Sequence, residues 1–409
     1  MTLDLPFPWG PADRTGIMPI SGGTTGPSGF RAAGVASGVK ASGKPDLAVL
    51  VSNERAAAAA VTTTNRVKAS ACHLTDRHVA DGAAQAVVIN SGNANVCTPD
   101  GHAHTELLAK QTAQHLQIAV DDVLVMSTGV IGVPLPIGTI VAALPTAVSQ
   151  LSTTGGHGAA VAMMTTDTHP KEVAYDVQDA HGGRCTIGGM VKGVGMIEPA
   201  MATMLAVITT DAQVPAPTLD QILRDSVAIT FNRISVDGDG STSDTVAILA
   251  NGAAGPVDES TLARAIHAVC AELAAMVVTD GEGATRIAGV TVSGTDDHHD
   301  AESLARSVAT SLLVRAALHG ADPNWGRILM ALGNAGVDFD PRQVQVDCAG
   351  VTVCRGGVAV PFDHHQAAQA MQADAVAIDV VVGAGPGVAT VLTCDLTPEY
   401  VRFNSEYTT

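Results

Sequence analysis

The stretch that decides how this chain is organised covers residues 192–205 and reads KGVGMIEPAMATML. Residues 204–208 form an apolar run with β-branched members, which predicts a buried strand. Thr203 stands directly before this run, and it has two interpretations. It is either an ordinary β-former at a strand edge, or a residue that the chain exposes as a new N-terminus by breaking its own Ala202–Thr203 peptide bond. In the second case its α-amine, with a pKa of about 7.7–8.0, serves as the base for its weakly nucleophilic hydroxyl.

A second motif follows a strand predicted at residues 123–126. It reads STGVIG over residues 127–132 and contains Thr128 and Gly129. Glycines in such a turn allow backbone N–H groups to face a ligand, as an oxyanion hole requires. The alternative is an ordinary turn before a helix, which the sequence predicts at residues 136–151.

Four further polar residues are notable for the segments in which they lie. Thr166 lies in the cluster TTDT, where a capping or turn hydroxyl is the alternative. Lys192 lies among glycines eleven positions before Thr203, near enough in a hairpin to meet a substrate carboxylate or carbonyl, although a solvated surface lysine is the ordinary outcome. Glu282 has glycine on both sides in TDGEGATR, after a helix predicted at residues 260–278. Asn404 lies in the final run YVRFNSEYTT.

These motifs, together with GFRAAG at residues 29–34, resemble the ornithine acetyltransferase family, also called the bifunctional glutamate N-acetyltransferases. The resemblance extends over almost the whole chain. It implies self-cleavage between Ala202 and Thr203, with Thr203 as the acyl acceptor. It also implies an oxyanion hole at Thr128 and Gly129, and substrate contacts at Thr166, Lys192, Thr203, Glu282, Asn404 and Thr409.

The resemblance further implies a reaction. The enzyme is expected to move an acetyl group from N2-acetyl-L-ornithine to L-glutamate by a ping-pong mechanism in arginine biosynthesis. No cofactor is expected, and the sequence does not decide whether acetyl-CoA is a further co-substrate. The two cleaved chains are expected to form an α/β heterodimer, two of which would form a heterotetramer.

Two other functional classes share some of these features. An N-terminal-nucleophile amidase or aminopeptidase would cleave itself in the same way, but water would then resolve its ester. The related peptidases carry Ser at the cleavage point, so Thr203 favours the transferase. In an acidic binding protein without catalytic activity, Thr203 would be only a strand residue, and the chain would remain uncleaved.

Composition limits the partners and the compartment. The 409 residues are 46% hydrophobic and carry a net charge of −18, which argues against nucleic acid and acidic membrane surfaces as partners. Seven cysteines without a CxxC pair fit reduced thiols and a cytoplasmic protein. The first 16 residues show no signal-peptide pattern, and no uninterrupted apolar run reaches the length of a membrane span.

The predicted fold is α/β (α+β), with layered mixed sheets flanked by helices, of N-terminal-nucleophile type. We expect a catalytic domain at residues 1–285 and a smaller α/β domain at 286–409, whose aromatic-rich tail is anchored and returns to the active site. Strands at 47–51 and 56–62 are expected to form a hairpin, and a single helix is expected at 301–318. The pairs His298–His299 and His364–His365 are expected in exposed loops or strands without a metal.

Overall fold

The computed structural model describes residues 5–198 and 204–406. Contacts divide the chain into two compact units. One comprises Asp13–Asn232 and Asp239–Val277, and we call it the large unit. The other, the small unit, comprises Met1–Ala12, Arg233–Gly238 and Val278–Thr408, so the boundary predicted at residue 286 falls inside it.

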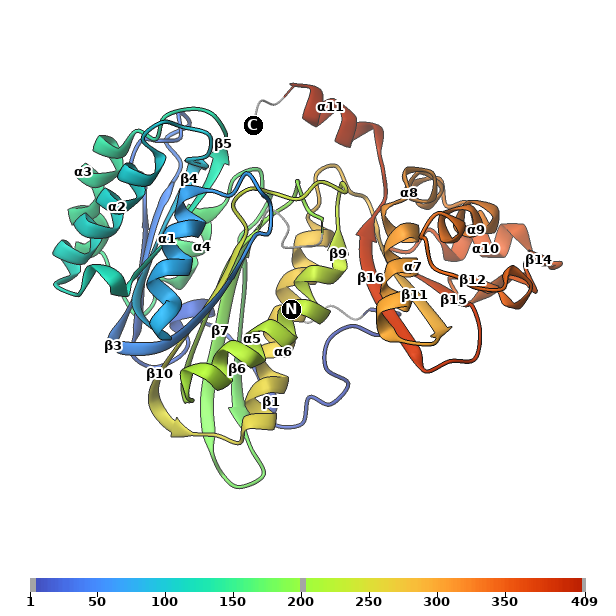
Figure 1. The fold of residues 1–409 in the computed structure, drawn as a ribbon, viewed down its shortest axis with the longest axis horizontal. Coiled ribbons are helices and arrows are strands. Elements are labelled where there is room, and N and C mark those ends of the chain that lie inside the picture. The colour runs from blue at the N-terminus through green and yellow to red at the C-terminus, as the bar shows by residue number, and fades with distance from the viewer. Residues whose placement is uncertain (1–4, 199–203, 407–409) are drawn as a thin grey trace. The chain divides into compact units, whose positions relative to one another are not determined.

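The large unit is built on a nine-stranded mixed sheet (Figure 1). Strands β8 and β10 are parallel, as are β4 and β5, and the other neighbours are antiparallel. The order across the sheet is β1 (Ile17–Ile20), β6 (Lys171–Gln178), β7 (Arg184–Lys192), β8 (Leu205–Gln213), β10 (Thr245–Pro256), β3 (Leu47–Thr62), β4 (Ala83–Asn93) and β5 (Val123–Val130), with β2 (Phe30–Val35) paired to β3.

The hairpin predicted at residues 47–62 is wrong, because these residues form the single long strand β3. Its first part pairs with β2 and β4 and its last part with β10, and the register with β4 shifts between Val51 and Ala56. One core cluster contains Leu50 and Ala58 of β3 together with Met126 of β5 and Met190 of β7. The sheet therefore folds over at β3, and its two halves enclose a common core.

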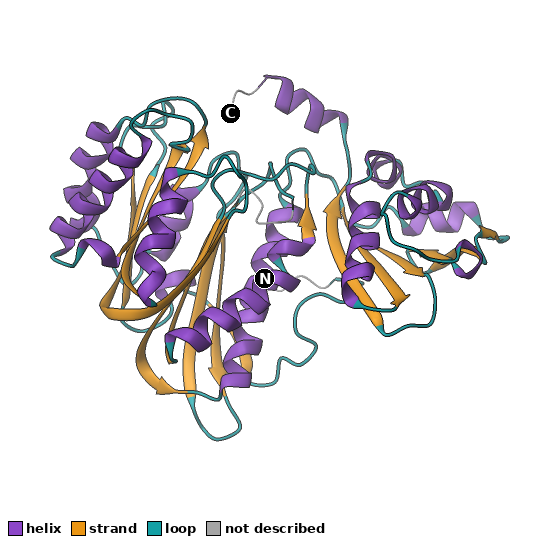
Figure 2. Cartoon of the chain, in the orientation of Figure 1, coloured by secondary structure: helices purple, strands orange, loops and turns teal. Residues whose placement is uncertain are grey.

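Helices cover the outer faces of this folded sheet (Figure 2). Alternate residues of β3 point to opposite sides, so Leu47 and Val49 pack with α1 (Ser70–His78), α2 (Gly101–Leu116) and α3 (Ile137–Ser149). On the other half, Val269 and Leu273 of α6 (Glu259–Thr279) lie against Gly189 of β7. The helix α5 (Ala216–Ile229) contacts β3, and α4 (Gly156–Met163) contributes to the enclosed core. The layered α/β fold predicted from the sequence is confirmed.

Helix α6 is long and apolar enough to cross a membrane by length and composition alone. However, 78% of its apolar window is buried inside the structure. The contacts of Val269 and Leu273 with β7 identify α6 as a core helix.

The small unit contains a seven-stranded sheet with helices packed on it. Ala288, Val290 and Val292 of β11 point into its core, and Phe7 lies against Gly289 on the other face. The order is β14 (Val358–Ala359), β13 (Val351–Arg355), β12 (Gln345–Cys348), β15 (Ala375–Val381), β11 (Ile287–Thr295), β16 (Gly387–Cys394) and β9 (Ile234–Ser235). The helices are α7 (His298–Thr310), α8 (Leu312–His319), α9 (Trp325–Gly333), α10 (His364–Ala370) and α11 (Pro398–Glu406).

Two local predictions for this unit are wrong. The helix expected at residues 301–318 is two helices, because Ser311 is extended and its side chain caps α8 by accepting from the N–H of Val314. Both histidine pairs begin helices, α7 and α10, each of which is capped by a preceding aspartate. The four histidines are exposed, as predicted.

Candidate active site

Thr128 and Gly129 lie inside β5, near its end, where the sequence predicted a turn. Thr128 is 2% exposed. Gly129 pairs in register with Gly92 of the parallel strand β4. It has φ +129, and a Cβ atom there would lie 2.4 Å from the carbonyl carbon of Gly92. Glycine is therefore required at position 129, both by the backbone conformation and by the close approach of the two strands.

The asparagine-rich run at the end of β4 supports this strand end. Asn90 donates from Nδ2 to the hydroxyl of Ser127 at 3.0 Å, and Asn93 donates to the carbonyl of Val133 at 2.9 Å. The backbone N–H of Ala94 donates to the carbonyl of Val130. These contacts hold the residues on both sides of Thr128 and Gly129, which is the preorganisation that an oxyanion hole needs.

Lys192 ends β7 and faces Thr128 across the enclosed core. Its side chain is almost fully buried, and Nζ donates to Thr128 Oγ1 at 3.5 Å. The two side chains come from strands in opposite halves of the folded sheet. A buried ammonium beside a threonine hydroxyl favours negative charge that develops on a substrate oxygen.

A buried carboxylate, Asp167, balances the lysines. It accepts from Lys171 Nζ at 2.6 Å and from the backbone N–H of Gly193, the residue after Lys192, at 2.9 Å. Burial alone would raise the pKa of Asp167, but the charges of Lys192 and Lys171 overcome this and hold its pKa well below the usual value. Asp167 therefore stays ionised, and it orients the end of β7. Its neighbour Thr166 is half-buried.

A third lysine, Lys40, lies at the same end of the sheet. Nζ donates to the carbonyls of Met164 at 2.7 Å and Pro45 at 2.8 Å, and the stem of Lys40 packs near Gly92. Burial lowers the pKa of Lys40 to about 8, although the carboxylates of Asp46 and Asp167 oppose this shift. Lys40 thus supports the loop that leads to Thr166.

Met204, the residue after Thr203, is held in place by polar contacts. Its N–H donates to Asp244 Oδ1 at 2.9 Å, and its carbonyl accepts from the N–H of Thr245 at 3.1 Å. In the next pair of the ladder, Leu205 lies opposite Lys192. Thr203 and Ala202 themselves, like Thr409, lie outside the described residues.

Glu282 and Asn404 lie together in the small unit. Nδ2 of Asn404, on α11, donates to Glu282 Oε2 at 3.0 Å. Helix α11 has no buried residue in its described part. Its aromatic residues Tyr400 and Phe403 are half-buried, and polar contacts also hold this segment. Thr397 Oγ1 donates to the carbonyl of Gly283 at 2.8 Å and accepts from the N–H of Tyr400.

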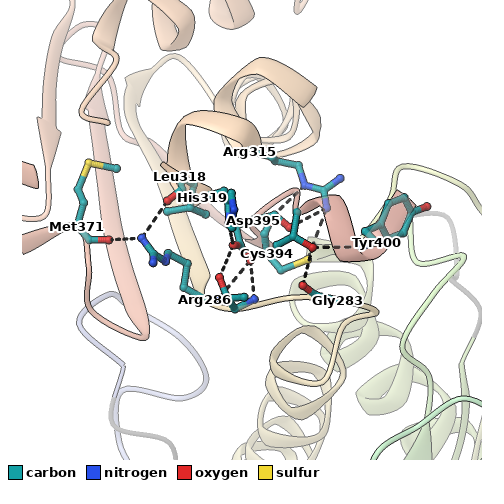
Figure 3. Close-up of polar contacts among 11 residues, drawn as sticks. Gly283, Arg286, Arg315, Leu318, His319, Met371, Cys394, Asp395 and Tyr400 are labelled. Atoms are coloured by element: carbon teal, nitrogen blue, oxygen red, sulfur yellow. Dashed lines mark hydrogen bonds and ion pairs between the residues drawn. The ribbon is translucent and has the colours of Figure 1, made fainter. Parts of the chain in front are cut away.

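Asp395 fixes the other end of the loop that carries Glu282 (Figure 3). Its carboxylate accepts from the N–H and hydroxyl of Thr285, the N–H of Arg286 and Nδ1 of His319. Burial alone would raise the pKa of Asp395, but the bonds from Thr285, His319 and Arg286 hold its pKa below the usual value. The fully buried Arg315 donates to the carbonyl of Cys394 at 2.9 Å. This network gives Glu282 and Asn404 a rigid base.

Comparisons with known proteins place this arrangement in a family. The ArgJ family model matches residues 31–409. The chain belongs to the ArgJ family. The arginine biosynthesis bifunctional protein ArgJ of Synechococcus sp. is 45% identical over 411 residues, covering 95% of this chain and 98% of its own. The ArgJ protein of Thermus thermophilus is 44% identical over 386 residues, covering 94% and 99%.

Solved structures of ArgJ proteins are also similar to this chain. A crystal structure of ornithine acetyltransferase complexed with ornithine, from Mycobacterium tuberculosis, is 40% identical and covers 45% of this chain and 98% of its own, with a TM-score of 0.42. A crystal structure of the ArgJ protein of Bacillus halodurans is 34% identical and covers 49% and 97%, with a TM-score of 0.47. The family model and the curated relatives confirm the family identified from the sequence, and with it the prediction of an acetyltransferase of arginine biosynthesis.

The structure of this ArgJ family member brings together some of the residues predicted from the sequence. Thr128, Gly129 and Lys192 meet in the large unit, whereas Glu282 and Asn404 meet in the small unit. The resemblance assigns these residues their roles, and those roles remain predictions. Residues 5–198 and 204–406 contain no group of three or more His, Cys, Asp or Glu side chains that could hold a metal ion.

Sequence reasoning missed Asp167, Asp244 and Lys40. Asp167 had a visible signal, because it interrupts an apolar pattern beside Thr166. Asp244 directly precedes a predicted strand, where a carboxyl is costly to bury without a reason. Lys40 gave no signal, since only the fold brings it near Met164.

Proposed function

We propose that this chain transfers an acetyl group from N2-acetyl-L-ornithine to L-glutamate through an acetyl ester on Thr203, after cleaving its own Ala202–Thr203 bond. The contact between Lys192 and Thr128, together with the fixed position of Met204, carries the proposal. Strand pairing sets Lys192 opposite Leu205, two residues after the proposed nucleophile. The predicted oxyanion donors and this lysine therefore lie at the end of the sheet where β8 begins.

Self-cleavage follows from the chemistry of threonine. The hydroxyl oxygen of Thr203 attacks the carbonyl carbon of Ala202, the carbon–nitrogen bond breaks, and the nitrogen takes up the hydroxyl proton. Water then hydrolyses the resulting ester, which leaves a carboxylate on Ala202 and a free α-amine and hydroxyl on Thr203. Thr128 and Gly129 stabilise the tetrahedral oxyanion of the attack.

The transfer uses the same groups in two half-reactions. The Thr203 hydroxyl attacks the acetyl carbonyl of the donor, its proton passes through the α-amine to the leaving nitrogen, and ornithine departs. The α-amine of glutamate then attacks the ester, and its proton returns to the Thr203 oxygen as N-acetylglutamate leaves. One nucleophile serving two substrates in turn gives ping-pong kinetics.

The proposal also names the residues that contact the substrate. The carboxylate of Glu282 suits a substrate ammonium, and the hydrogen bond from Asn404 orients that carboxylate. Thr166, Lys192 and Thr409 complete the proposed contacts. The proposal includes a heterodimer of the two cleaved chains, paired into a heterotetramer, in the cytoplasm. The proposal further includes acetyl-CoA as a second acetyl donor, and it includes no cofactor.

Intact mass analysis under denaturing conditions tests the proposal. The wild type should show two chains of 202 and 207 residues (409 − 202 = 207), and N-acetylornithine should add one acetyl group to the second chain. Thr203→Ala should remain one chain, whereas the control Thr203→Ser keeps a hydroxyl and should still cleave. Two chains from Thr203→Ala would overturn the assignment of the nucleophile.

The kinetics and the products separate the transferase from a hydrolase. Double-reciprocal plots with N-acetylornithine and glutamate should give parallel lines. Formation of acetate in place of N-acetylglutamate would identify an amidase. Intersecting lines without acetylation of the second chain would indicate direct transfer between the substrates.

A further inference from the structure

The ammonium group of Lys192 is buried next to a hydroxyl. Lys192 is 3% exposed, and its Nζ donates to Thr128 Oγ1 at 3.5 Å. A hydroxyl carries no charge, so this contact does not compensate for the burial of the ammonium. Burial favours the neutral form of a lysine unless a carboxylate lies close to it. Because a developing oxyanion is stabilised by the charged form, the group that supplies the compensating charge matters for the reaction.

Asp167 is the carboxylate that the fold fixes at this end of β7. Its Oδ1 accepts the backbone N–H of Gly193, the residue after Lys192, at 2.9 Å. Its Oδ2 accepts the N–H of Thr165 at 2.8 Å. Oδ1 also accepts from Lys171 Nζ at 2.6 Å, and neither side chain of that ion pair is exposed. Contacts from both sides therefore fix the position of this carboxylate relative to the backbone of β7.

The charges of Asp167 and Lys192 act on each other. Burial alone would raise the pKa of Asp167, but the charge of Lys192 and then that of Lys171 hold it well below its usual value. This interaction is mutual, so the carboxylate also favours the charged form of Lys192. Two other charged groups interact with Lys192. Lys40 is a like charge, and burial lowers its pKa to about 8. Burial raises the pKa of Asp244 well above its usual value, so Asp244 is protonated more readily than Asp167.

We infer that Asp167 is a positioning residue for Lys192: its carboxylate keeps this buried ammonium charged beside Thr128, and it thereby sets the upper pH limit of the reaction. This inference rests on the proposed function, in which Thr128 lies in the oxyanion hole. The value of kcat should fall at high pH as Lys192 loses its proton. A carboxylate with only a structural role would fasten the start of β6 to the end of β7 without setting this limit.

Asp167→Asn removes the charge and keeps the shape of the side chain. The amide oxygen can still accept from Gly193 and Lys171. The alkaline limb of the kcat profile is measured in the cleaved enzyme with saturating N-acetylornithine and glutamate. In Asp167→Asn this limb should move to lower pH by about 1–3 pH units, the scale of losing one opposite charge.

Lys171→Met is the matched variant, because it breaks the same ion pair from the other side. If Asp167 acts only through packing, both variants lose the same bond and should change the profile alike. If it acts through charge, Lys171→Met removes a positive charge that opposes the ammonium of Lys192, so the limb should move to higher pH. Asp211→Asn is the control. It removes a buried carboxylate six residues beyond Leu205 on β8, about 20 Å along the strand at about 3.3 Å per residue, and should leave the limb unchanged.

The outcomes separate this inference from the proposed function. An uncleaved wild type, or one that transfers no acetyl group, would refute the proposed function itself. With an active wild type, a limb that moves down in Asp167→Asn but not in Lys171→Met or Asp211→Asn supports the inference, and any other result overturns it. Folding is checked by thermal unfolding in the uncleavable Thr203→Ala chain. If Asp167→Asn does not fold or does not cleave, Lys171→Met decides: a limb at higher pH supports the inference, and an unchanged or lower limb overturns it.

Discussion

Replacing Gly129 by alanine tests whether the close approach of β4 and β5 builds the oxyanion hole. Gly129 has φ +129, a conformation that L-residues rarely adopt. The added Cβ would lie 2.4 Å from the carbonyl carbon of Gly92 and 2.6 Å from the nitrogen of Asn93. These neighbours are backbone atoms of a paired strand, so they cannot move aside as a flexible side chain could.

Two contributions determine how much stability Gly129→Ala should lose. A residue forced into a sparsely populated backbone region costs about 1–3 kcal/mol. Overpacking a buried position costs a further amount of about 1–3 kcal/mol. Gly129→Ala should therefore lower the free energy of unfolding by about 2–6 kcal/mol. Gly132→Ala, three residues further along the chain, is the control, because Gly132 has φ +78 but no atom within 4 Å of the added carbon. It should cost only about 1–2 kcal/mol.

Stability is measured by urea unfolding in the Thr203→Ala background, where self-cleavage cannot complicate the transition. Activity is measured in the cleavable chain. The separation of the two strands displaces Thr128 and the backbone of residue 129, so Gly129→Ala should lose about 10²–10³-fold in kcat, the scale of a lost oxyanion donor. Gly132→Ala should keep most of its activity.

The reasoning fails if Gly129→Ala matches Gly132→Ala in stability and retains full kcat. That result would mean that β4 and β5 can separate at no cost and that the oxyanion donors lie elsewhere. Loss of stability with full activity would confirm the packing argument but remove Gly129 from the catalytic machinery.

Three further predictions follow from the same contacts. Thr128→Ala should lower kcat by about 10²-fold, and an unchanged kcat would place the oxyanion hole elsewhere. Deletion of residues 404–409 removes Asn404, the partner of Glu282, and should raise KM for N-acetylornithine while self-cleavage stays intact; unchanged kinetics would remove Asn404 and Thr409 from the site. Lys40 has a folded pKa of about 8, below its usual 10.5, so the unfolded chain binds more protons between these values and stability should rise over pH 8–10.5. Lys40→Met should flatten that rise in urea titrations, and an unaltered pH dependence would mean that Lys40 is not buried.

Local sequence patterns were sufficient to predict most of the helices and strands named above. The apolar run after Thr203 is β8, and the helices predicted at residues 136–151 and 260–278 are α3 and α6. The spacing of apolar residues in these elements follows from a single buried face, so it can be recognised in a short stretch of sequence. The resemblance identified the family and supplied the candidate residues, because these lie in short contiguous motifs.

Such local patterns do not show which distant strands pair with one another. The apolar runs at residues 47–51 and 56–62 fit a hairpin as well as a single strand, and only pairing with β2, β4 and β10 makes them one strand that folds the sheet over. The apolar residues between 301 and 318 keep a helical spacing across Ser311. However, α7 ends at this point, because Ser311 is extended and its hydroxyl caps the start of α8.

The sequence by itself, through its resemblance to the family, supplied the predicted nucleophile motif, the predicted oxyanion glycine and the predicted substrate residues, because each lies in a short contiguous motif. Only the tertiary structure brought Lys192 to Thr128 and Asp244 to Met204, across 64 and 40 positions of the chain. The physical reason is that burial and charge compensation are properties of a position in space. Asp167 and Asp244 are both buried carboxyls, yet two lysine ammonium groups lower the pKa of Asp167 while burial raises that of Asp244.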